Sequence, residues 1–71
     1  MADLRWCTLV EAALREFAPD DEAQREVLLG RLRATEDYRI ARAQLLAGAS
    51  DRVICELLRR PLNDMTGTET T

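Results

Sequence analysis

The side chains best suited to proton transfer or nucleophilic attack are scarce in this 71-residue chain, which contains neither His nor Lys. Without His, no Ser–His or Cys–His catalytic pair can form. The acids Asp20, Asp21 and Glu22 could supply a carboxylate pair, but they directly follow Pro19, where a new helix would use them as caps. The sequence therefore predicts a protein that is not an enzyme and that uses no cofactor.

Cys7 and Cys55 are the two cysteines of the chain. A zinc site needs about four N, S or O ligands, and two distant cysteines without His do not supply them. Each cysteine falls on or beside the apolar stripe of its predicted helix, so we expect both to be buried as small hydrophobic side chains. The sequence predicts neither a metal site nor a disulfide.

Arginines gather near the middle of the chain around one tyrosine. Arg and Tyr are enriched among the residues that anchor protein–protein interfaces. The cluster therefore predicts a docking patch for an acidic partner, although Glu36 and Asp37 could instead neutralise it as part of a solvated helix face. The predicted partner-binding residues are Tyr38, Arg39, Arg42, Arg31 and Arg33.

The segment 40–60 favours an alternative function. A small-residue turn at 48–50 separates two helical stretches, and the small residues before it, with Ile54 and Leu57 after it, resemble a helix-turn-helix. In that arrangement the last helix would read DNA. The side chains that it would offer to DNA are Arg52, Arg59 and Arg60.

Three observations oppose DNA binding. Gln44 stands where the helix-turn-helix pattern expects a small residue, and Glu56 lies midway along the proposed reading face. The whole chain carries a net charge of −3, which disfavours general affinity for nucleic acid or for an anionic membrane surface. A DNA-binding transcriptional regulator is therefore the second hypothesis.

Apolar side chains recur at helical spacing along most of the chain. The expected helices cover residues 3–17, 21–33, 36–47 and 51–60. Pro19 and Pro61 should end the first and the last helix, because proline restricts the residue before it and disrupts a helix interior. The candidate N-caps are Asp3, Asp20 or Asp21, Thr35 and Ser50.

One helix boundary is ambiguous. A break near Ala34–Thr35 is favoured because Thr35 is followed by two acids, but a single helix from 21 to 47 is the alternative. Gly48 suits the left-handed conformation that often closes a helix. The side chains expected to face the core include Trp6 in the first helix, Ala23, Val27, Leu28 and Leu32 in the second, and Val53, Ile54, Leu57 and Leu58 in the last.

These observations predict an all-α fold, a compact bundle of three or four short helices. Residues 1–62 form a single domain, and residues 63–71 form a flexible Thr-rich tail. The apolar positions Leu9, Leu29 and Leu46 lie off the main stripes. These leftover positions favour binding to another protein. Self-association would bury the surplus of Leu and Ala, and the expected dimer forms through the segment 38–46.

The functional expectation is a small interaction protein, acting as a regulator, inhibitor, adaptor or chaperone by binding a larger protein. Two cysteines and no signal-peptide pattern indicate a reducing, cytoplasmic setting. The uninterrupted apolar stretches are far shorter than a membrane span requires. We therefore expect no association with the membrane.

Overall fold

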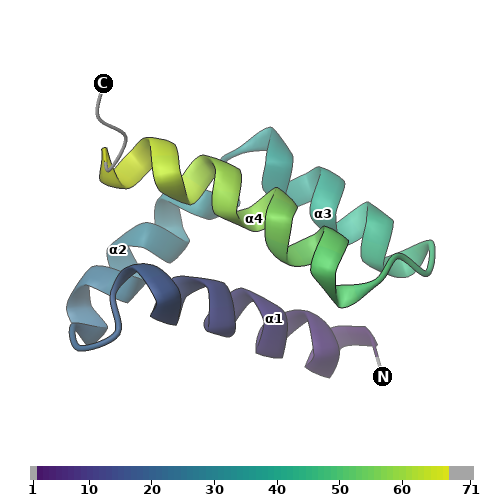
Figure 1. Cartoon of the computed structure of the whole chain (residues 1–71), viewed down its shortest axis with the longest axis horizontal. Helices are drawn as coiled ribbons and strands as arrows, with labels where there is room; N and C mark the ends of the chain where they lie inside the picture. Colours follow the sequence, from purple (N-terminus) through teal and green to yellow (C-terminus); the bar gives the residue numbers. More distant parts are fainter. Residues whose placement is uncertain (1, 68–71) are drawn as a thin grey trace.

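Four α-helices make up the computed structural model, which describes residues 2–67. Helix α1 spans Ala2–Phe17, α2 spans Glu22–Arg33, α3 spans Glu36–Leu46 and α4 spans Asp51–Thr66. No strand occurs within these described residues, so the predicted all-α bundle is confirmed. Figure 1 shows α3 and α4 folding back on each other as a hairpin, with α1 alongside α4.

The predicted capping residues set most of the helix boundaries. The side chain of Asp21 accepts from the backbone N–H of Gln24 at 3.0 Å, and Thr35 and Ser50 cap α3 and α4 in the same way. Thr35 has extended backbone angles, so the break at Ala34–Thr35 is confirmed and residues 21–47 form two helices. Asp3 lies within the first turn of α1, so its prediction as N-cap was wrong.

The core is made of side chains from all four helices, and all of them except Trp6 are aliphatic. Leu28 and Leu32 of α2 meet Ile54 and Leu58 of α4 in this core, and all four are fully buried. Trp6 is 4% exposed, which confirms its prediction as a core residue. Leu9, predicted to lie off the stripe, is also buried, together with Val10, Ala13, Leu14, Ala18, Ala41, Leu45 and Leu62.

Some residues predicted to face the core are exposed instead. Val27 is 55% exposed and Val53 is 42% exposed, and Ala23 lies at the surface as well. Leu57 is only half-buried. The side of α2 that is buried therefore differs from the predicted one: it includes Leu29, which is partly buried and packs at the edge of the core.

Helix α4 runs through Pro61 to Thr66, so the predictions that Pro61 ends the helix and that the tail begins at residue 63 were wrong. A proline inside a helix costs about 3 kcal/mol because it removes a hydrogen bond and clashes with the preceding turn. Pro61 and Leu62 are buried and Met65 packs against the core, so continued burial along α4 offsets that cost. The predicted flexibility of residues 68–71 falls outside the described residues.

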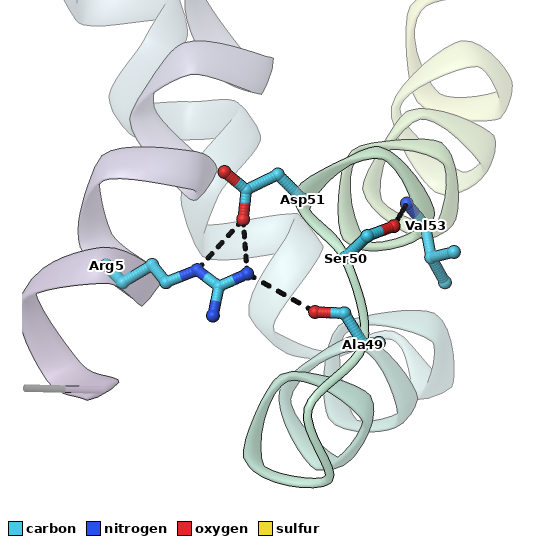
Figure 2. Close-up of polar contacts among 5 residues, drawn as sticks. All are labelled: Arg5, Ala49, Ser50, Asp51 and Val53. Atoms are coloured by element: carbon cyan, nitrogen blue, oxygen red, sulfur yellow. Dashed lines mark hydrogen bonds and ion pairs between the residues drawn. The ribbon is translucent and has the colours of Figure 1, made fainter.

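The turn between α3 and α4 is tied to the start of α1. Gly48 has a φ of 96°, as expected for the residue that closes α3. Figure 2 shows the guanidinium of Arg5 donating to the carboxylate of Asp51 and, at 3.2 Å, to the carbonyl of Ala49. The Ser50 hydroxyl accepts from the backbone N–H of Val53 beside this contact. The bonds of Arg5 link the hairpin of α3 and α4 to α1, and the bond of Ser50 caps α4.

Over residues 2–67, none of the helices has both the length and the apolar character needed to cross a bilayer. The cytoplasmic location and the dimer through residues 38–46 stay predictions.

Candidate functional site

A groove of about 500 Å³ lies between α1 and α2 and is the candidate functional site. Its size falls within the range of about 300–1,000 Å³ that is typical of binding pockets. Apolar side chains form much of its lining, and charged side chains surround them. The apolar and aromatic lining residues are Trp6, Val10, Leu14, Leu29 and Tyr38.

Helix α1 presents two neighbouring rows of side chains to this groove. Trp6, Val10 and Leu14 recur every four residues and are buried against the core along their inner edges. The next residue after each of them belongs to the second row, which is exposed: Cys7, Glu11 and Arg15. Residues four apart lie on one side of a helix, so the two rows form an apolar wall with a polar edge.

Helix α2 forms the opposite wall. Figure 1 shows α2 leaving the α1–α2 turn at an angle to α1, so the two helices diverge along their length. Leu28 and Leu32 anchor α2 in the core, while Leu29 faces the groove. Because Leu28 and Leu32 anchor one face of α2 in the core, the adjacent face of α2 that carries Leu29 lines the groove beside α1.

Two aromatic rings close one end of the groove. The rings of Trp6 and Tyr38 meet edge to face, with centroids 5.1 Å apart. The indole N–H of Trp6 donates to the Tyr38 hydroxyl at 3.3 Å. The guanidinium of Arg42 lies 5.8 Å from the centre of the Trp6 ring and forms a 3.1 Å ion pair with Asp3. This end is therefore held in place by contacts between α1 and α3.

Several charges around the groove already have partners within the protein. Arg15 and Glu11 form an ion pair on α1 at 3.1 Å. Arg25 donates to the carbonyl of Ala18 at 2.7 Å and to that of Pro19 at 3.1 Å, and so satisfies acceptors at the end of α1. Three other charged residues of the lining have no ion pair among the described residues: Glu22, Glu26 and Arg33.

The predicted docking patch is only partly assembled. Arg33 and Tyr38 both line the groove, and Arg42 lies behind it against Trp6. Arg31 and Arg39 are exposed but do not line the groove.

The three arginines of the DNA-binding alternative differ in their surroundings. Both nitrogens of the Arg59 fork donate to the carboxylate of Glu16, at 2.9 and 2.8 Å. This hydrogen bond lowers the pKa of Glu16 and raises that of Arg59. All three arginines are exposed. Arg59 joins α4 to α1, whereas Arg52 and Arg60 have no ion pair among the described residues. DNA binding stays a prediction, with one of its three arginines engaged in an ion pair at the surface.

The cysteines are not paired with each other. Cys7 is exposed at the edge of the groove, so the prediction that it is buried was wrong. Cys55 is half-buried, and its burial raises the pKa of the thiol. Among the described residues, no group of three or more Cys, Asp or Glu side chains is placed to hold a metal ion.

Sequence reasoning missed the acidic side of the groove and the orientation of Leu29. A usable signal was present in α2, where residues 22, 26, 29 and 33 recur at helical spacing and contain one leucine among three charges.

Comparison with protein-family models, curated proteins and solved structures found no match to this chain.

Proposed function

We propose that this protein is a small binding module that acts by holding a segment of a larger protein in the groove between α1 and α2. The observation that carries the proposal is the groove itself, in which the half-buried side chains of Leu29 and Tyr38 lie among exposed charged side chains. Interfaces of this kind are anchored by aromatic and aliphatic side chains at the centre, while the surrounding polar residues contribute specificity. Such a module needs no catalytic group, and it could regulate, inhibit or chaperone its partner.

Two further features support a binding surface at this place. Trp6 and Tyr38 are joined by a hydrogen bond and edge-to-face packing, so part of the groove wall is fixed before any partner arrives. A preorganised wall reduces the entropy lost on binding. Tyr38 and Arg33, which sequence analysis assigned to a docking patch, line this same groove.

Replacing Leu29 by Glu should abolish partner capture, because it places a charge in the apolar centre of the groove. Loss of a central anchor typically costs about 2 kcal/mol or more, or roughly a thirty-fold loss of affinity. The measurement is affinity capture from the source cells with the wild-type chain and the variant, followed by titration of any captured protein.

Val27→Glu is the matched control. It introduces the same charge on the same helix, but Val27 is exposed and does not line the groove. Val27→Glu should unfold at a temperature close to that of the wild type, whereas Leu29→Glu removes a side chain that packs against the core and should unfold at a lower temperature. Capture is therefore compared at a temperature at which circular dichroism shows both variants to be folded. A partner that binds Leu29→Glu and wild type equally well would exclude the groove as its site. Recovery of DNA, or of a second copy of this chain, in place of another protein would contradict the proposal.

A further inference from the structure

We infer that the groove accepts an amphipathic helix of the partner that carries Lys or Arg near one end and Asp or Glu near the other. This inference rests on the proposed function, and it names the chemistry of the segment that is bound. It follows from the charges along α2 and from the backbone of the two groove walls.

The unpaired charges of the groove differ in sign between its two ends. Glu22 and Glu26 lie in the first half of α2, close to the α1–α2 turn, and Arg33 is the last residue of that helix. All three are exposed and line the groove, with Leu29 between them. Glu11 and Arg15 neutralise each other. Arg25 donates only to neutral carbonyls and keeps its positive charge beside Glu22 and Glu26, so two negative charges and one positive charge leave that end with a net charge of −1. Arg33 gives the other end a positive charge, so the groove offers an acidic end and a basic end to a ligand.

The separation of these charges fixes the spacing that a ligand must match. With a rise of about 1.5 Å per helical residue, Arg33 lies about 10 Å along α2 from Glu26 and about 17 Å from Glu22. A helix lying beside α2 would need its cation and its anion roughly two to three turns apart to meet both ends. Apolar side chains between these charges would chiefly contact Leu29, because Trp6 and Val10 are only 4% and 6% exposed.

The walls favour a helix over an extended peptide. Both walls are helices, whose backbone N–H and C=O groups are largely satisfied within each helix. An extended segment buried between them would therefore leave its own backbone groups without partners, which is costly. A helix satisfies its backbone internally, and its side-chain ridges can fit beside the rows on α1.

A library of displayed helical peptides, selected on the full-length protein, tests this inference. Peptides that bind Leu29→Glu are removed, so the remaining peptides depend on the groove. We expect the enriched sequences to contain Leu, Ile, Phe or Met at helical spacing, with a cation and an anion two to three turns apart. The peptide with the highest affinity is then synthesised and titrated against the variants below.

Arg33→Glu should lower the affinity of the protein for this peptide about three- to ten-fold, as expected when an exposed pair of opposite charges is replaced by a pair of like charges. Changing the peptide's own acidic residue to Lys should restore the affinity for Arg33→Glu, which a merely structural effect of the substitution would not do. Arg31→Glu is the matched control, because Arg31 is exposed on the same helix and does not line the groove.

The outcomes separate this inference from the proposed function. Groove-dependent peptides that are extended, or that lack the two opposite charges, would overturn the inference and leave groove binding intact. Equal weakening by Arg33→Glu and Arg31→Glu would do the same. If Leu29→Glu abolishes capture of the natural partner but no helical peptide is enriched, the inference is also wrong. If neither the partner nor any peptide depends on Leu29, both the inference and the proposed function fail.

Discussion

Replacing Leu58 by Ala should lower the free energy of unfolding by about 2–5 kcal/mol. Leu58 is fully buried at the centre of α4, where it packs with Leu28, Leu32 and Ile54. Truncation removes apolar contacts and leaves a cavity that a core this small can fill only partly. A domain of this size has few kcal/mol to lose, so the variant should unfold at markedly lower urea concentration or not fold at all.

Leu57→Ala is the control for this prediction. Leu57 is adjacent in sequence and chemically identical, but it is only half-buried. Truncation of Leu57 should lower the free energy of unfolding clearly less than truncation of Leu58 does. Equal losses for the two variants in urea titrations followed by circular dichroism would mean that α4 is rotated relative to the arrangement described above.

Replacing Leu62 by Ala should also lower the free energy of unfolding by about 2–5 kcal/mol, although Leu62 follows a proline. The side chain is fully buried because α4 continues beyond Pro61 and keeps the same face toward the core. If the helix ended at the proline and the chain frayed from there, Leu62 would be exposed in part and its truncation would cost little. The measured free energy of unfolding therefore reports directly on the last turns of α4.

Asn63→Ala provides the comparison, since Asn63 is the next residue of the same helix and its side chain is exposed. Exposed substitutions of this kind usually change stability by no more than about 0.5 kcal/mol. A small effect at both positions would show that residues after Pro61 contribute nothing to the core.

The fold class and most helix boundaries could be predicted because they depend on local chemistry. Asp21, Thr35 and Ser50 cap helices through contacts with residues three positions away, and Gly48 closes α3 through its own backbone angle. Such contacts are encoded within a few residues of sequence. They require no knowledge of how the helices pack.

Helix packing explains the predictions that failed. Val27 and Leu29 are both apolar and lie on different sides of α2, and only the position of α1 decides which of them is covered. Pro61 should end a helix on local grounds, but burial of Leu62 and Met65 outweighs that preference. These outcomes depend on contacts between segments far apart in the chain.

The candidate site was only partly predictable for the same reason. Arg33 and Tyr38 belong to a patch that the clustering of arginines along the sequence could identify. Their neighbours across the groove, Cys7 and Val10, come from a different helix, and their position depends on the angle between α1 and α2. No periodicity within one segment specifies that angle.

The most direct test of groove binding uses the exposed thiol of Cys7 at the groove edge as a reporter. In a Cys55→Ala background, Cys7 is the only cysteine of the chain, so its rate of alkylation can be followed by mass spectrometry with and without a saturating amount of the captured partner. A partner seated between α1 and α2 should slow alkylation of Cys7 markedly. The Leu29→Glu variant of the same background should show no such protection. An alkylation rate for Cys7 that stays unchanged while the partner is bound would contradict binding in this groove.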